Sequence, residues 1–220
     1  MTATGQATKR NHLVTEQLEL NAVRFRYFKL TVTIAIISLL FAAVFGLISG
    51  IVFEDYQYLS GLQLYIEVAI QLTFHLAMVF LILWFGRAYS NLFVLGKENL
   101  RHDVNWGFFS WYVPGLNFFM PFRILKDVYV GFSELAGDDD QKGRSVILKL
   151  RVFWWVLYSA LPVLYMLSII LLLDHPTAMQ FLLLALYKIF MVLFWIIGLY
   201  ITEQIHEREE RVYRMHTARA

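Results

Sequence analysis

The sequence contains no cysteine, which excludes disulfide bonds, thiolate catalysis and metal sites built on cysteine ligands. Charged residues are also scarce: they make up 16% of the chain, whereas soluble proteins contain about a quarter. The net charge of +2 at pH 7 is too small to indicate a nucleic-acid partner. With 59% of its residues hydrophobic, the chain has the composition of a protein that lies in a lipid bilayer.

Four apolar runs are each long enough to cross a bilayer, which takes about 20 residues. They cover residues 30–53, 62–85, 151–173 and 178–201. The runs predict an all-α integral membrane protein with a four-span domain at residues 30–202. Residues 1–29 and 203–220 are expected to lie outside the membrane, the first 14 or so disordered and the C-terminal segment helical.

Lysine and arginine are unevenly distributed along the chain. Five precede the first span, nine lie in residues 86–151, four lie in the tail, and the last is Lys188 inside the fourth span. Neither short connection between spans contains a basic residue. The positive-inside rule therefore predicts that both termini and the long middle region are cytoplasmic.

The middle region contains an apolar segment, residues 104–122, that is almost long enough to span. Helix-breaking residues interrupt it, and backbone groups freed at such breaks have no partners in lipid. These residues are Gly107, Pro114, Gly115, Asn117 and Pro121. We expect residues 104–134 to form a re-entrant or interfacial segment on the cytoplasmic side that ends in an amphipathic helix, about 121–134.

A pattern within residues 84–131 resembles that of a known family. It consists of Trp84, Arg87-Ala88, Asn91-Leu92, Trp111, Val113-Pro114, Asn117 and Pro121. In these residues the chain is similar to the bacterial membrane family called domain of unknown function 4328, over about residues 60–200. The resemblance implies a multi-span protein of the bacterial inner membrane, but it implies no activity and no catalytic residues. The family usually has isoleucine where this chain has Gly115, which predicts a tighter turn here.

Four polar residues of this region form the first candidate site: Arg87, Asn91, Asn117 and Arg123. Arg87 and Asn91 lie one helical turn apart, and Asn117 and Arg123 flank Pro121. Guanidinium and amide groups suit phosphate or carboxylate, so one interpretation is a pocket for a lipid head group or a small anion. The alternative is that these side chains cap helix ends and satisfy carbonyl groups freed at the prolines.

A polar stripe in the second span forms the second candidate site. Gln63, Glu67, Gln71 and His75 recur every four residues and so share one helix face. Lys188 in the fourth span is expected at a similar depth, within reach of Glu67 or Gln71. The interpretations left open are a structural buried pair, a proton or ion path, and a Lys188 that reaches toward the membrane surface without a partner.

No metal, cofactor or catalytic residue is predicted, because the spacing contains no P-loop, HExxH or nucleophile–base pair. Asp138-Asp139-Asp140 does not fit a calcium loop, since Lys142 and Lys149 occupy ligand positions, and we expect a solvated linker. His75 is the only histidine deep in a span, so two facing haem ligands are absent from the sequence.

Small residues recur every four positions in the first span, at Ser38, Ala42, Gly46 and Gly50. Such a row lets another helix approach closely, either within the chain or in a second copy.

Three functions remain open. The first is a non-enzymatic scaffold or sensor that binds a lipid head group, a small anion or a protein partner at its cytoplasmic face. The second is a small ion- or proton-coupled transporter or channel that uses Glu67, His75 and Lys188. The third is an interfacial lipid-modifying enzyme, which a cavity lined by Arg87, His102, Asp103 and Asp127 would favour.

Overall fold

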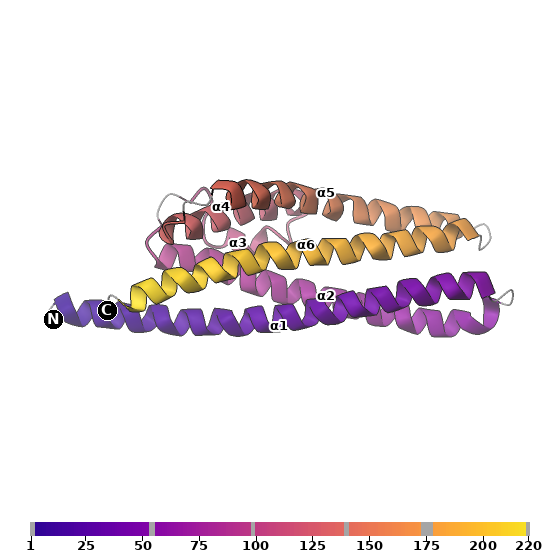
Figure 1. The fold of residues 1–220 in the computed structure, drawn as a ribbon, viewed down its shortest axis with the longest axis horizontal. Coiled ribbons are helices and arrows are strands. Elements are labelled where there is room, and N and C mark those ends of the chain that lie inside the picture. The colour runs from indigo at the N-terminus through magenta and orange to yellow at the C-terminus, as the bar shows by residue number, and fades with distance from the viewer. Residues whose placement is uncertain (1–2, 53–55, 98–99, 139–140, 173–177, 219–220) are drawn as a thin grey trace. The chain divides into compact units, whose positions relative to one another are not determined.

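The computed structural model describes residues 3–52, 56–97, 100–138, 141–172 and 178–218. Every regular element in these ranges is a helix, which confirms the predicted all-α class (Figure 1). Four helices are long: α1 (Ala3–Val52), α2 (Tyr56–Val94), α5 (Gln141–Leu172) and α6 (Ala178–Thr217). Three are short: α3 (Trp106–Phe109), the 3-10 helix η1 (Leu116–Phe118) and α4 (Met120–Leu135).

The four long helices are each apolar and long enough to cross a membrane, as the sequence predicted. The candidate spans are Asn21–Ile48, Tyr65–Val94, Gly143–Leu167 and Leu182–His216. The expectation of disorder at the N-terminus is wrong for residues 3–14, which belong to α1. No proline precedes Pro114 in the sequence, so nothing stops the helix of the first span from continuing toward the N-terminus.

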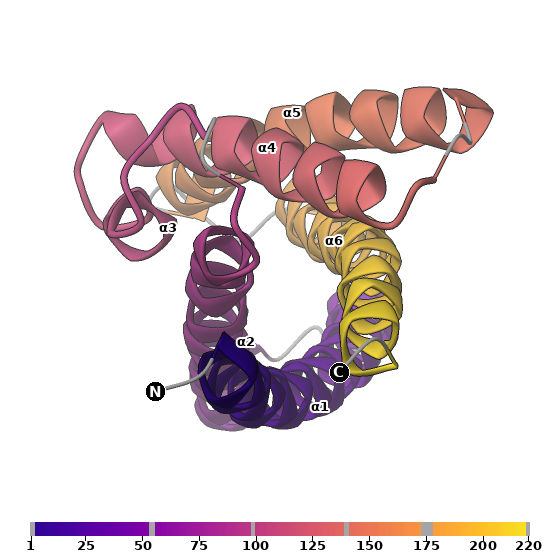
Figure 2. The ribbon, with the colours of Figure 1, turned by 90° about the vertical axis from the view of Figure 1, so that its left-hand side faces the viewer.

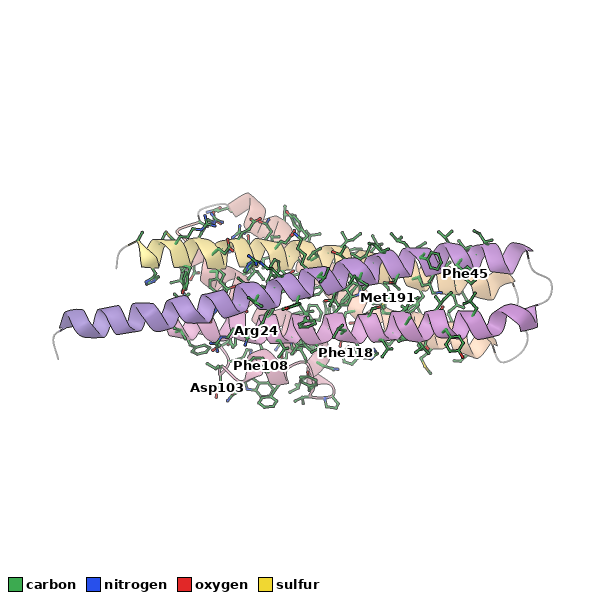
Figure 3. The ribbon with its side chains drawn as sticks, turned by 90° about the horizontal axis from the view of Figure 1, so that it is seen from below. Arg24, Phe45, Asp103, Phe108, Phe118 and Met191 are labelled. Atoms are coloured by element: carbon green, nitrogen blue, oxygen red, sulfur yellow. The ribbon has the colours of Figure 1, made fainter. Side chains whose placement is uncertain are left out.

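The chain divides into two compact units, and each long helix contributes to both. The first unit comprises Met1–Phe28, Val79–Val152 and Tyr200–Ala220. The second comprises Lys29–Met78 and Phe153–Leu199. Figure 3 shows their side chains, with Arg24 and Phe108 labelled in the first unit and Phe45 and Met191 in the second.

Aromatic rings and two glycines hold the first unit together. The ring of Trp111 packs edge-on against Phe85, with ring centroids 5.6 Å apart, and both side chains are buried. Gly86 in α2 faces the ring of Phe108, which would lie 2.5 Å from a Cβ atom at that position. Gly107 in turn lies against the Cα atom of Gly86. The absence of two side chains therefore lets α3 pack directly on α2.

The segment from α3 to α4 folds as short helical pieces because its proline and glycine residues interrupt it. Gly115 has a φ of 80°, a conformation that favours glycine, and it precedes η1. Pro121 lies in the first turn of α4, where its missing N–H costs nothing. Figure 2 shows α4 alongside the first turns of α5. The amphipathic helix predicted at about 121–134 is thus present as α4.

The second unit has a core of tryptophan, phenylalanine and small residues. Trp154 packs on Phe194 at 5.3 Å and closely approaches Gly198. In the small-residue row, Ala42 is buried within the chain, whereas Ser38 and Gly46 are half-buried and the side-chain environment of position 50 lies outside the described residues. Large apolar side chains such as Ile37, Phe41 and Val163 remain exposed, as a lipid-facing surface requires.

Candidate functional site

A cavity of about 490 Å³ in the first unit is lined entirely by basic residues. We call it the basic pocket; its lining residues are Arg101, His102, Arg123, Lys126 and Arg151. Arg101 and His102 come from the loop before α3, Arg123 and Lys126 from α4, and Arg151 from α5. Three segments distant in sequence therefore direct positive charge into one space.

Local structure explains how these side chains are placed. The hydroxyl group of Tyr89 in α2 donates a 2.6 Å hydrogen bond to the carbonyl oxygen of His102, which fixes the loop before α3. On α4, Arg123 and Lys126 are three residues apart, so they lie on one side of the helix. The buried residues on the opposite side of α4, including Ile124, Leu125 and Val128, anchor it in the core.

Arg151 is the most constrained side chain of the basic pocket. Its Nη1 atom donates a 2.8 Å hydrogen bond to the carbonyl oxygen of Phe122, in the first turn of α4. Its Nε atom is buried and has no partner among the described residues. A buried guanidinium N–H without an acceptor costs free energy.

The carboxylate of Asp127 interacts electrostatically with residues that line the basic pocket. Its Oδ2 atom is buried and has no partner among the described residues. Burial raises the pKa of Asp127, and the positive charges of Arg101, His102, Lys126 and Arg151 oppose that rise. The cations of the pocket therefore act on a nearby carboxylate, outside the lining, that is costly to ionise.

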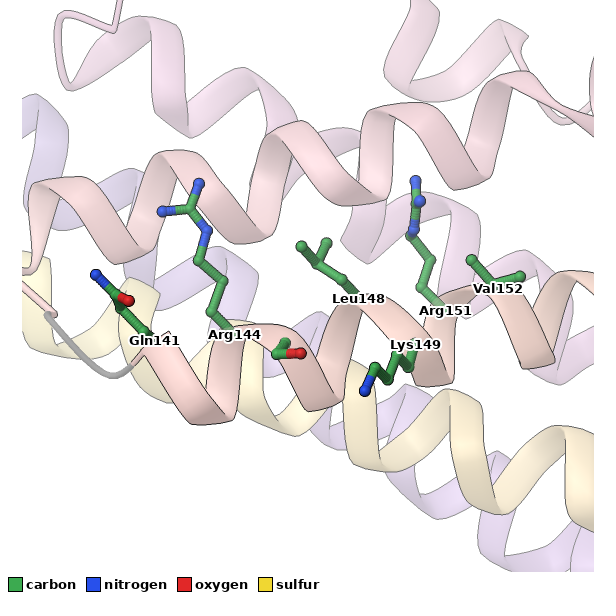
Figure 4. Close-up of a pocket in the computed structure, with 7 residues that line it drawn as sticks. Gln141, Arg144, Leu148, Lys149, Arg151 and Val152 are labelled. Atoms are coloured by element: carbon green, nitrogen blue, oxygen red, sulfur yellow. The ribbon is translucent and has the colours of Figure 1, made fainter.

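Arg151 also lines a second cavity, of about 730 Å³, along the start of α5. We call it the α5 cavity; its lining residues are Gln141, Arg144, Ser145, Leu148, Lys149, Arg151 and Val152. Figure 4 shows that Arg144 and Arg151 extend from α5 in the same direction, with Leu148 between them.

The structure places the four residues of the first candidate site in different local contacts. Only Arg123 lines the basic pocket. Asn91 is buried and donates a 2.6 Å hydrogen bond to Glu209 in α6. Arg87 lies near enough to Arg24 for their charges to repel, and the Oδ1 atom of Asn117 is buried with no partner among the described residues.

The residues that resemble the family pattern mostly maintain the fold. Trp84, Ala88 and Leu92 are fully buried in the first unit, and Trp111 is nearly so. The basic pocket is not the cavity that would favour a lipid-modifying enzyme. The basic pocket includes His102, but its lining residues do not include Arg87, Asp103 or Asp127.

A buried carboxylate connects α1, α2 and α6 in the first unit. Glu209 is 1% exposed and accepts hydrogen bonds from the side-chain amide of Asn21, at 2.7 and 2.8 Å, and from that of Asn91. His206 Nδ1 lies 3.4 Å from the same carboxylate. Sequence analysis placed Glu209 only in a charged tail, because three partners that are 3, 118 and 188 residues away leave no local signal.

A second ionic contact in the first unit corrects the expectation of a solvated linker at Asp138. The carboxylate of Asp138 lies 3.0 Å from Nε of Arg208 and 3.2 Å from Nη2 of Arg211. The Arg208 guanidinium is buried and stacks over the ring of Tyr129, 4.7 Å from its centroid. The contact joins α6 to the end of α4, and residues 139–140 lie outside the described residues.

In the second unit, the ammonium group of Lys188 donates to the carboxylate of Glu67. The pair that the sequence placed within reach is therefore formed. Gln71 bonds through its side chain to Tyr187 and through its carbonyl oxygen to His75 Nδ1, at 2.6 Å. His75 is exposed rather than directed into the helix bundle, and the side chain of Gln63 lies outside the described residues.

Sequence analysis missed most residues of the basic pocket. The sequence pattern identified Arg123 as a ligand-binding residue and His102 only in the enzyme hypothesis. Three further residues, Arg101, Lys126 and Arg151, were used only to predict which side of the membrane the middle region occupies. The available signal was the density of basic residues in 86–151. Among the described residues, no group of three or more histidine, aspartate or glutamate side chains is arranged to hold a metal ion.

Comparison with known proteins gives one match. A family model described as "Domain of unknown function (DUF4328)" matches residues 49–205. No curated protein matches the chain, and no solved structure matches it.

Proposed function

Because this chain belongs to the family Domain of unknown function (DUF4328), whose description assigns no activity, we propose a function from its own geometry. The protein is a non-enzymatic membrane scaffold or sensor that binds a phosphate-bearing anion in the basic pocket. The anion is either a lipid head group or a soluble phosphate compound, since both present the same acceptor oxygens to arginine and lysine.

One observation carries this proposal: four permanent cations and a histidine, contributed by three separate segments, surround a single cavity of about 490 Å³. Cations so placed repel one another, and a bound anion removes that repulsion. The volume lies within the range of about 300–1,000 Å³ that is usual for small-molecule sites. The buried Nε atom of Arg151 supplies a donor that lacks an acceptor among the described residues.

The proposed location is the bacterial inner membrane, with both termini and the basic pocket in the cytoplasm. The uneven distribution of lysine and arginine supports this orientation. Cysteines substituted at Asp55 and Thr177 are then expected to react with an impermeant thiol reagent from outside the cell, and one at Gln141 is not. Labelling at Gln141 from outside would mean that residues 104–122 cross the membrane.

The function is tested by measuring phosphate binding to the purified protein. Phosphatidylglycerol retention is measured by native mass spectrometry, and binding of inorganic phosphate and pyrophosphate by calorimetry. The test variant is Arg123→Gln with Lys126→Gln, which removes two charges from the pocket. The control is Arg26→Gln with Arg214→Gln, which removes two exposed charges that do not line it.

We expect the pocket variant to lose affinity by about tenfold or more, because each charge-assisted hydrogen bond contributes about 1.5–3 kcal/mol. The control is expected to stay within about twofold of wild type, since exposed charges contribute little. The ligand that loses affinity identifies the source as lipid or soluble phosphate. Equal losses in both variants, or none in either, would contradict the proposal.

Ion- or proton-coupled transport is a second candidate, favoured by the contact between Lys188 and Glu67 within the candidate spans. Ionisable groups at membrane depth often mark ion or proton pathways. In proteoliposomes, transport through this pair predicts a proton or sodium flux that Glu67→Gln abolishes. A flux that Glu67→Gln leaves unchanged, or no flux in the wild type, would leave the pair a structural one.

A further inference from the structure

Two cavities with basic walls meet at one residue. The basic pocket and the α5 cavity share Arg151 and no other lining residue. The α5 cavity adds two cations of its own, Arg144 and Lys149. Neither has an ion-pair partner among the residues that the structure describes. The two cavities therefore both present cationic side chains, and the Arg151 side chain lies where they meet.

The spacing along α5 separates the two cationic centres. Arg144 and Arg151 are seven residues apart, which is two helical turns and about 10 Å of helix. They extend in the same direction in Figure 4. A single phosphate in the basic pocket is close to Arg151 but leaves Arg144 without an anion, so the full set of cations fits a ligand with two separated anionic groups.

The wall of the α5 cavity is partly apolar. Leu148 and Val152 line it beside the cations, and Val146 and Val152 are 44% and 48% exposed. The cavity begins where the third candidate span, Gly143–Leu167, begins. Arginine and lysine at the end of a span lie at the depth of lipid head groups, and apolar side chains of the same turns face the acyl chains. This surface suits a lipid better than a soluble polyanion.

We propose that the ligand is a phospholipid whose head group carries two phosphates, one held in the basic pocket and the other by Arg144. Arg151 lies between the two phosphates, and the acyl chains lie along the apolar side of α5. The inference rests on the proposed function, because it names the source of the phosphate in the basic pocket and adds a second phosphate site.

The test compares two lipids on four forms of the full-length protein. The lipids are cardiolipin, which has two phosphates, and phosphatidylglycerol, which has one. The forms are the wild type, Arg123→Gln in the basic pocket, Arg144→Gln in the α5 cavity and Arg26→Gln as an exposed control. Native mass spectrometry in a lipid titration gives each dissociation constant, and thermal unfolding without added lipid confirms that each form is folded.

We expect wild type to bind cardiolipin about tenfold more tightly than phosphatidylglycerol, the effect of one further charge-assisted contact. Arg144→Gln should remove this preference and leave phosphatidylglycerol binding unchanged. Arg123→Gln should weaken binding of both lipids, and a fifth form, Arg144→Lys, should retain part of the preference because it keeps the positive charge. Arg144 is exposed, so its replacement is not expected to disturb folding.

The outcomes separate the inference from the proposed function. If Arg123→Gln weakens the binding of both lipids but Arg144→Gln changes the affinity for neither, the anion site stands and the second phosphate site is wrong. If Arg123→Gln changes the affinity for neither lipid, the proposed function itself fails. If Arg26→Gln acts like Arg144→Gln, the preference reflects general attraction to charged lipid and the two-phosphate site is again wrong.

Discussion

The Nη1 atom of Arg151 in α5 donates a 2.8 Å hydrogen bond to the carbonyl oxygen of Phe122 in α4. This bond fixes the guanidinium between the basic pocket and the α5 cavity, both of which Arg151 lines. It also occupies one donor of a group that has five, so the remaining N–H groups are presented in a fixed direction.

Replacing Arg151 should therefore distinguish the contribution of its charge to ligand binding from the contribution of its fixed orientation. Arg151→Lys keeps the positive charge but cannot both bond the Phe122 carbonyl and fill the fork-shaped donor set. We expect phosphatidylglycerol affinity to fall several-fold in Arg151→Lys, and about tenfold or more in Arg151→Gln, measured by native mass spectrometry. Equal affinity in Arg151→Lys and wild type would show that only the charge matters.

Gly86→Ala tests the direct packing of α3 on α2. Alanine normally stabilises a helix interior by about 1 kcal/mol relative to glycine. Here its Cβ atom would lie 2.5 Å from the Phe108 ring, and such overpacking costs about 1–3 kcal/mol. We expect a lower unfolding temperature for Gly86→Ala and none of this loss for Gly46→Ala, where nothing lies within 4 Å. Adding Phe108→Ala should recover the loss; failure to recover it would place the strain elsewhere.

Glu209→Gln tests the buried carboxylate of the first unit. Asn21 donates to both carboxylate oxygens of Glu209 and Asn91 donates to Oε1, so glutamine replaces one acceptor oxygen with an NH2 group that faces the Asn21 amide and has no acceptor there. An unsatisfied buried donor costs about 1–3 kcal/mol, which chemical denaturation in detergent should detect. Glu207→Gln, on the exposed side of the same helix, is the control and should have little effect. Equal stability of the two variants would mean that the buried bonds contribute nothing net.

The pair of Lys188 and Glu67 should behave as a unit in a double-mutant cycle. The side chain of Lys188 is 4% exposed and that of Glu67 is 30% exposed. Leaving the lysine without its partner therefore costs more free energy than leaving the glutamate without its partner. We expect Glu67→Gln to lower thermal stability more than Lys188→Met, by up to about 3–5 kcal/mol. The double variant should be more stable than Glu67→Gln alone. Additive losses would show that the two charges do not interact.

Asp127 should make stability depend on pH in an identifiable direction. Burial raises its pKa in the folded protein above the ordinary value of 3.8, so the folded state binds its proton more tightly than the unfolded state does. The resulting stabilisation is complete below that ordinary value and is lost as pH rises through the raised pKa.

Asp127→Asn removes this titration. We expect the variant to gain stability relative to wild type at neutral pH and to gain none at the acid end of the range. Thermal unfolding of both proteins across pH 3–8 measures the difference. His102→Gln serves as a control, because His102 lines the basic pocket and is one of the groups that act on Asp127. The others are Arg101, Lys126 and Arg151, which are permanently charged. A constant difference between Asp127→Asn and wild type would contradict the assignment.

Elements with a local signal were predicted well. Helix α4 was placed to within a residue at each end, because its apolar period and Pro121 are both visible in sequence. The contact of Lys188 with Glu67 followed from depth alone, since both lie in spans whose polar residues are few. The convergence of Arg87, Asn91, Asn117 and Arg123 stays a prediction: only Arg123 lines the basic pocket, and side-chain direction depends on helix rotation, which spacing in the chain does not specify.

The amino-acid sequence by itself determined that this protein is an all-α membrane protein with four spans, because runs of apolar residues longer than a bilayer is thick allow little else. Tertiary structure alone decided which polar groups meet. Arg101, Arg123 and Arg151 are up to 50 residues apart in the chain, and only the folded arrangement of the loop before α3, α4 and α5 brings them around one cavity. Glu209 likewise finds Asn21 only through the folded contact of α1 with α6, since no local rule relates residues 188 positions apart.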